Sequence, residues 1–107
     1  MSRSDDVIVT AGYNVGPHEV ESVLARHPLV AEVACTGEAD ERKGQVIAAH
    51  VVLSGEAPEA LVEELRRWVG ERVGWHAAPR HVYVLDELPR TESGKVRRAA
   101  LRADHHR

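Results

Sequence analysis

A lysine near the C-terminus has the surroundings best suited to chemistry in this chain. Lys95 ends the segment LPRTESGK, residues 88–95, and directly follows a flexible glycine. Its ammonium is a compact, mobile point charge that suits a carboxylate or phosphate oxygen. The segment is not a P-loop, because it lacks the upstream glycine and has Val96 where serine or threonine would bind magnesium. An ordinary surface loop with a solvated lysine remains the competing interpretation, since short motifs recur by chance.

Basic residues gather around this lysine, although the formal net charge of the chain is -3. Against a single acidic residue, Glu92, residues 90–102 include Arg90, Lys95, Arg97, Arg98 and Arg102. This local excess of positive charge could attract an anionic substrate such as a nucleotide or coenzyme A. It would equally complement the C-terminal dipole of a last helix. The negative total charge argues against non-specific binding of nucleic acid.

A glycine near the N-terminus is the second candidate. Gly12 follows the short apolar run VIV at residues 7–9 and precedes Tyr13. A glycine after a strand lets another backbone or a ligand approach closely, because no Cβ intervenes. A plain hairpin turn would explain the same pattern.

Hydrophobic patterning predicts the elements that must position these two segments. Two short strands around Gly12 form a hairpin, and further strands are predicted at 30–36, 46–53 and 81–85. Helices are predicted at 17–27, 58–73 and 96–103. We therefore expect an α+β fold: a small mixed sheet of about three strands with helices packed on it, plus an N-terminal two-stranded hairpin.

Three finer predictions follow from the same pattern. The polar segment GEADERKGQ, residues 37–45, is typical of a charged turn. Ala31, Val33 and Cys35 alternate along the strand before it, so they should share one face. Trp68 lies on the apolar stripe of the longer helix and should be largely buried.

Length and composition narrow the class of protein. A chain of 107 residues accommodates one domain. No signal peptide is apparent, and no apolar run approaches the roughly 20 residues that span a bilayer. The single Cys35 excludes an internal disulfide, and the seven histidines lack the spacing of known metal sites. We expect a cytoplasmic protein without a metal site, a membrane partner or a nucleic-acid partner.

Three segments, taken in order, resemble the C-terminal domain of the adenylate-forming (AMP-binding) acyl-CoA synthetase superfamily. They are RSDDVIVTAGYNVGPHEVESVLARHPLVAEVA, EADERKGQVIAAHVVL and LPRTESGKVRR, and the resemblance covers residues 3–102. The segment SGKVRR near the C-terminus, and the segment VIVTAG at residues 7–12, which contains no lysine, are more similar to acyl-CoA ligases than to peptide-synthetase domains. The segment GYNVGPHEVES looks most like the medium-chain acyl and benzoate-type CoA ligases.

The resemblance implies an ATP-dependent carboxylate–CoA ligase. Such an enzyme forms an acyl-adenylate from a carboxylic acid and ATP/Mg²⁺, and then transfers the acyl group to CoA. Met1 stands where family members continue upstream, so we expect a missing N-terminal adenylate-forming domain as partner. The isolated chain should be inactive and bind no cofactor tightly. The alternative is a free-standing noncatalytic module that acts in trans or serves as a lysine acyltransferase substrate.

The resemblance also implies roles for five residues. Lys95 would enter the active site in the adenylating orientation and stabilise charge on the carboxylate and α-phosphate. Asp5 matches the hinge, and Arg3 matches a neighbouring contact to the nucleotide ribose. Gly12 and Tyr13 match the loop that lines the tunnel for the pantetheine arm of CoA. Acetylation of Lys95, by an acetyltransferase and reversed by a deacetylase, is a further expectation.

The implied domain map is simple. It places the hinge at 3–6, the hairpin at 7–15, the core at 17–88, the catalytic-lysine loop at 89–96 and the tail at 103–107. Three features depart from the family pattern: Asn14 stands where many members have arginine, Arg90 stands where lysine is frequent, and one segment differs. Residues 74–77, GWHA, replace a stretch that is often rich in tyrosine and lysine.

Overall fold

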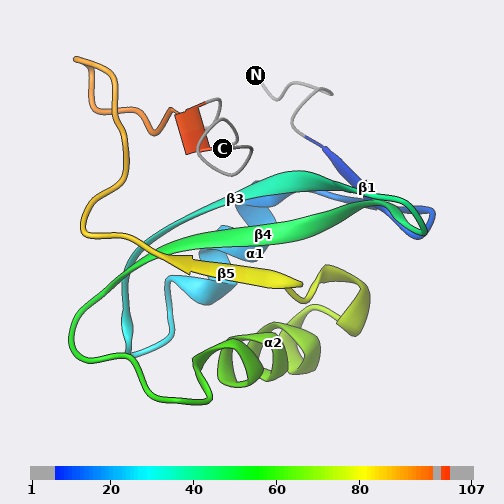
Figure 1. Ribbon diagram of the computed structural model, residues 1–107, viewed down its shortest axis with the longest axis horizontal. Coiled ribbons are helices and arrows are strands. Elements are labelled where there is room, and N and C mark those ends of the chain that lie inside the picture. Colours follow the sequence, from blue (N-terminus) through cyan, green and yellow to red (C-terminus); the bar gives the residue numbers. More distant parts are fainter. Residues whose placement is uncertain (1–6, 98–99, 102–107) are drawn as a thin grey trace.

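The computed structural model describes residues 7–97 and 100–101 (Figure 1). The predicted hinge, with Arg3 and Asp5, and the tail at 103–107 lie outside the described residues. The elements in chain order are β1 (Ile8–Thr10), β2 (Tyr13–Val15), α1 (Pro17–Leu24), β3 (Val30–Asp40), β4 (Gly44–Leu53), α2 (Leu61–Arg72), the 3-10 helix η2 (Trp75–Ala77) and β5 (His81–Val84). None of the helices in this part of the chain is long and apolar enough to cross a membrane.

The strands form one mixed sheet with β4 at its centre. Strand β3 runs antiparallel along one edge of β4, from Val30 to Asp40. The other edge is shared by β1, which pairs at Gly44, and by β5, which runs parallel over residues 48–51. The prediction of an α+β fold is confirmed. The sheet has five strands, because the Thr10–Gly44 pairing joins the β1–β2 hairpin to the three predicted strands.

The predicted turn at 37–45 is wrong over most of its length. Strand β3 continues to Asp40 and β4 begins at Gly44, so only residues 41–43 turn. The Asp40 carboxylate accepts the backbone N–H groups of Arg42 and Lys43 at 3.1 and 2.9 Å, which closes the turn tightly. The polar residues around it therefore belong to a long two-stranded ribbon rather than to a loop.

The predicted shared face in β3 is also wrong at its first residue. The pairing with β4 is irregular between Val30 and Glu32, where β3 has a bulge. A bulge adds one residue to one strand, so the alternation of faces shifts across it. Ala31 is consequently exposed, whereas Cys35 is fully buried in the main core.

Helices α1 and α2 cover one face of the sheet. Their buried residues Val20, Leu24, Leu65 and Val69 form a core with Ile47 and other apolar residues of the sheet. Pro17 opens α1, as expected for a residue that lacks the N–H left unpaired there. Helix α1 ends three residues before the end predicted from sequence. Helix α2 begins three residues after its predicted start and ends one residue before its predicted end.

Trp68 of α2 is mostly buried, as predicted, and packs against the main core. Its indole N–H donates a hydrogen bond to the Val23 carbonyl at 2.8 Å, which fixes α2 against the end of α1. The Arg72 guanidinium lies 3.4 Å from the indole centroid. The indole ring therefore packs between the core and the Arg72 guanidinium. Its N–H has a hydrogen-bond acceptor, and its π face has a cation.

The opposite face of the sheet carries a second, smaller core. Leu88 and Leu101 are buried there against Ala34 of β3, and Val96 packs beside them. Residues 100–101 are helical, but Val96 pairs with Arg90 instead of starting the predicted helix. This second core anchors both ends of the segment that contains Lys95.

Candidate functional site

Lys95 ends a closed loop that begins at Arg90. Arg90 and Val96 form an antiparallel bridge, and the Thr91 N–H donates to the Lys95 carbonyl at 2.8 Å. The Gly94 N–H donates back to the Thr91 carbonyl at 2.9 Å, with Gly94 at φ +90°. That left-handed conformation favours glycine. The SGK sequence therefore builds a small hairpin with a defined shape.

The Lys95 side chain is exposed on this loop. Its backbone N–H donates to the Thr91 hydroxyl at 3.3 Å, and that hydroxyl lies 3.0 Å from the Ser93 hydroxyl. Across residues 7–97 and 100–101, no side chain pairs with the Lys95 ammonium. Within the part of the chain that the structure describes, the Lys95 ammonium therefore faces solvent.

The Arg90 guanidinium connects this loop to the sheet. One nitrogen, Nη1, donates to the Gly94 carbonyl at 2.9 Å, and Nη2 forms an ion pair with the Glu32 carboxylate on β3. Glu32 and Arg90 are 58 residues apart in sequence. Sequence reasoning placed Arg90 in the cationic group but could not find this partner.

The β1–β2 hairpin presents Gly12 at its turn. Ala11 and Gly12 have φ values of 52° and 86°, as the two central residues of a type I′ turn require. A Cβ added at Gly12 would meet no atom within 4 Å, so the outer surface of the turn is open. The exposed Tyr13 ring stacks on His76, with centroids 4.6 Å apart.

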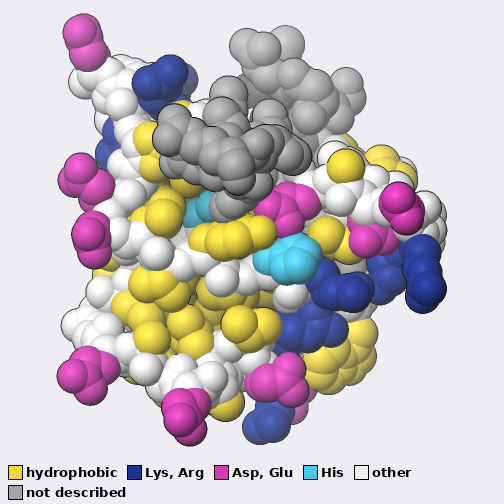
Figure 2. Space-filling view, viewed as in Figure 1, with side chains coloured by type: hydrophobic (Ala, Val, Ile, Leu, Met, Phe, Trp, Pro, Cys, Tyr) yellow, Lys and Arg dark blue, Asp and Glu magenta, His cyan; other side chains and the backbone are white. Residues whose placement is uncertain are grey.

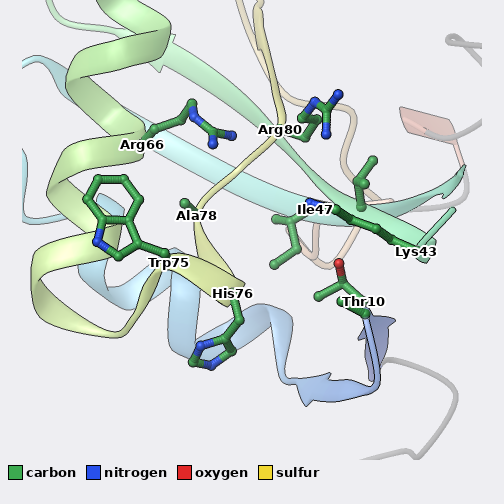
Figure 3. A pocket seen from close by; sticks show the side chains of 10 residues that line it. Thr10, Lys43, Ile47, Arg66, Trp75, His76, Ala78 and Arg80 are labelled. Atoms are coloured by element: carbon green, nitrogen blue, oxygen red, sulfur yellow. The ribbon is translucent and has the colours of Figure 1, made fainter.

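A cationic pocket, which sequence reasoning missed, opens beside this hairpin (Figure 3). Its cavity volume is about 60 Å³, and its polar lining comes from Thr10, Lys43, Arg66, His76 and Arg80. Arg66 also donates to the Pro79 carbonyl at 2.9 Å, which ties α2 to the segment before β5. The three basic residues come from three distant segments, so no spacing in the sequence indicated the pocket.

Figure 2 shows basic side chains gathered on the same side of the molecule. They lie over the β3–β4 turn and the segment that enters β5, where Arg42, Lys43 and Arg80 surround an open hollow together with Asp40 and Glu41. This side of the domain therefore combines positive charge with an exposed glycine turn and an aromatic pair.

Two buried histidines, His27 and His50, have hydrogen-bonding partners within the fold. His27 accepts the Leu29 N–H at Nδ1, 3.1 Å away, and its Nε2 lies 3.0 Å from Glu64. His50 Nε2 lies 2.9 Å from the Thr36 hydroxyl. Next to His50, burial raises the pKa of Tyr83 to about 12, assisted by the hydrogen bond that Tyr83 donates to Glu38.

The structure does not bring the two candidate sites together. The Gly12 hairpin lies beside the turn end of the β3–β4 ribbon, whereas residues 90–96 project away from the sheet near the start of β3 (Figure 1). The two sites therefore lie at separate ends of one domain.

Comparison with known proteins assigns the chain to a family. The AMP-binding enzyme C-terminal domain family matches residues 19–95. Acetyl-coenzyme A synthetase of Streptomyces coelicolor is 46% identical over 104 residues, covering 95% of this chain and 16% of that protein. The Bacillus subtilis acetyl-coenzyme A synthetase is 45% identical over 105 residues, covering 96% and 18%. The chain thus spans less than a fifth of the length of these curated relatives.

Solved structures agree with this assignment. An acyl-CoA synthetase of Brucella canis superposes with a TM-score of 0.90 at 40% identity, covering 99% of this chain and 20% of that one. The Bacillus subtilis o-succinylbenzoate CoA synthetase, in complex with its acyl-adenylate intermediate, superposes with a TM-score of 0.84 at 39% identity, covering 94% and 20%. The resemblance stated from the sequence is confirmed: the chain belongs to the AMP-binding enzyme C-terminal domain family.

Proposed function

We propose that this chain is the mobile C-terminal domain of an ATP-dependent carboxylate–CoA ligase, acting with an N-terminal adenylate-forming domain. The observation that carries the proposal is the exposed Lys95 ammonium on its closed loop, without a partner among the described residues. The similarity to acetyl-CoA and acyl-CoA synthetases supports the reaction class. The substrates are a carboxylic acid, ATP with Mg²⁺, and CoA. We place the enzyme in the cytoplasm, because its single buried Cys35 suits a reducing compartment.

Lys95 acts in the first half-reaction. In the adenylating orientation its ammonium contacts the substrate carboxylate and the α-phosphate of ATP. Negative charge shifts between these oxygens in the transition state, as the acyl-phosphate bond forms and pyrophosphate leaves. A pre-positioned cation stabilises this transition state. We assign Arg3 to the ribose and Asp5 to the hinge on family resemblance alone.

The Gly12 hairpin acts in the second half-reaction. Its open turn lets the narrow pantetheine arm pass close to the backbone, because no side chain fills that space. Tyr13, held against His76, forms one wall. The neighbouring Lys43 and Arg80 supply positive charge for the phosphates of CoA.

The separation of these two sites supports domain alternation. The Lys95 loop is tied through Arg90 to Glu32 near the start of β3, whereas the Gly12 hairpin pairs with Gly44 at the turn end of the β3–β4 ribbon, so one fixed orientation would not place both in a single active site. Rotation about Asp5 would present the lysine first and the hairpin second. Acetylation of the exposed Lys95 would then inhibit only the first step, because it removes the charge.

The test measures the two half-reactions separately, in the enzyme that joins this domain to its N-terminal partner. Lys95→Ala should slow adenylation about a hundredfold or more, the typical effect of losing one charge-stabilising group. Thioester formation from preformed acyl-adenylate should be largely unchanged. Unchanged adenylation, or equal losses in both steps, would contradict the assigned role.

A further inference from the structure

Arg90 occupies a junction between the Lys95 loop and the sheet. Within the described residues, the hydrogen bonds of residues 91–95 are made only to other residues of the loop 90–96. These bonds fix the shape of the loop. They do not fix the direction in which it leaves the domain.

Two contacts set that direction. One is apolar: Leu88 and Val96 pack into the second core at the base of the loop. The other is polar, because the Arg90 guanidinium contacts the Gly94 carbonyl inside the loop and the Glu32 carboxylate on β3 at the same time. Gly94 directly precedes Lys95, so this contact acts one residue from the ammonium-bearing side chain.

We propose that Arg90 and Glu32 form a positioning pair that orients the Lys95 loop for adenylation. The proposal rests on the proposed function and adds a residue pair to it. Glu32 holds the guanidinium to β3, and the guanidinium holds the Gly94 carbonyl. Neither side chain contacts the reacting atoms.

An arginine suits this task better than a lysine. Its planar guanidinium carries five N–H donors in a fixed fork and can bind two acceptors with a defined angle between them. A lysine ammonium would retain the charge but bind both acceptors with less directional control. The irregular pairing of β3 between Val30 and Glu32 lies at the anchor point of this pair.

The pair should act on rate rather than on stability. Glu32 and Arg90 are 41% and 42% exposed, and exposed ion pairs contribute little to folding. In contrast, a reacting group displaced by about 1 Å can lose roughly a hundredfold in rate. Loss of the pair should therefore slow adenylation without unfolding the domain.

The experiment compares Arg90→Gln, Arg90→Lys and Glu32→Gln with wild type and Lys95→Ala, in the two-domain enzyme. We expect Arg90→Gln and Glu32→Gln each to lower kcat for adenylation about tenfold. The kcat of Arg90→Lys should lie between that of wild type and that of Arg90→Gln. Thioester formation from preformed acyl-adenylate and the melting temperature should be unchanged. Arg67→Gln is the matched control, because Arg67 is an exposed α2 residue without a side-chain hydrogen bond or ion pair among the described residues.

A second measurement reports the loop directly. In ¹⁵N relaxation measurements on this chain, the Gly94 and Lys95 amides should become more mobile in Arg90→Gln and stay ordered in Arg67→Gln. Adenylation unchanged in Arg90→Gln but lost in Lys95→Ala would overturn the positioning pair and leave the proposed function intact. Equal losses in both half-reactions for Arg90→Gln would also overturn it. Adenylation unchanged in Lys95→Ala would instead contradict the proposed function.

Discussion

The amide of Ala11 donates a hydrogen bond to the carbonyl of Lys43, with the two atoms 3.0 Å apart. This bond ties the Gly12 turn to the β3–β4 turn, beside the pairing of Thr10 with Gly44. The position of the proposed pantetheine turn thus depends on a second turn, about thirty residues later in the sequence.

Asp40 controls that second turn, and its effect should depend on pH. The N–H groups of Lys43 and Arg42 hold the pKa of Asp40 below its ordinary value of 3.8, with Lys43 the larger cause. A lowered folded-state pKa means that the ionised carboxylate stabilises the turn above pH 3.8 and that this is lost as the pH falls through the folded pKa. In Asp40→Ala, we expect hydrogen exchange at the Ala11 amide to be faster at neutral pH and to lose this acid dependence.

Asp86→Ala is the control for Asp40→Ala. Asp86 is exposed and, within the described part of the chain, has no hydrogen bond or ion pair. Exchange at Ala11 should match wild type in this variant. If Ala11 exchanges equally fast in wild type and Asp40→Ala, the β3–β4 turn does not hold the hairpin.

Local turn chemistry made the turns at Gly12 and Gly94 predictable from the sequence. Gly12 and Gly94 both adopt positive φ, and each follows the pattern of a turn between short strands. The burial of β4 on both faces was predictable for a similar reason, since its apolar run is continuous. These features depend on neighbours in the sequence.

The features that were missed depend on distant residues. Glu32 and Arg90 are 58 positions apart, and the pocket joins Lys43, Arg66 and Arg80 only through the fold. Periodicity also cannot reveal a bulge, because one extra residue reverses the faces without changing composition. The exposure of Ala31 beside the bulge could therefore not be predicted from the sequence.

The cationic pocket should affect the binding of CoA and no other substrate. Lys43→Ala and Arg80→Ala should each raise KM for CoA by up to about fivefold, which is the range expected for exposed charge contacts. The increase should shrink at high salt, because ions screen exposed charges. The KM values for ATP and for the carboxylic acid should not change.

Arg66 is unsuitable for that test, since its bond to the Pro79 carbonyl also holds α2 to the segment before β5. Arg26→Ala serves as the control, because Arg26 is exposed at the end of α1 and does not line the pocket. If wild type, Lys43→Ala and Arg80→Ala have the same KM for CoA, the pocket is not part of the proposed CoA-binding surface.

Gly12→Leu should block thioester formation while sparing adenylation. The leucine would fill the open space beside the turn, where we place the pantetheine arm. At φ +86° it would also strain the backbone by about 1 kcal/mol, which Gly12→Asn largely avoids because asparagine tolerates this region. Asparagine is still larger than glycine, so Gly12→Asn should remain slow in the thioester step if bulk is the cause and recover if strain is the cause.

Gly55→Leu is the matched control for this substitution. Gly55 lies in the exposed loop after β4, a Cβ there would also meet no atom within 4 Å, and its φ lies outside the left-handed region. Stopped-flow measurement of acyl transfer from preformed acyl-adenylate to CoA separates the step from adenylation. Since Gly12 lies apart from the Lys95 loop, an equal loss of adenylation in Gly12→Leu would show that the hairpin is not specific to the second half-reaction.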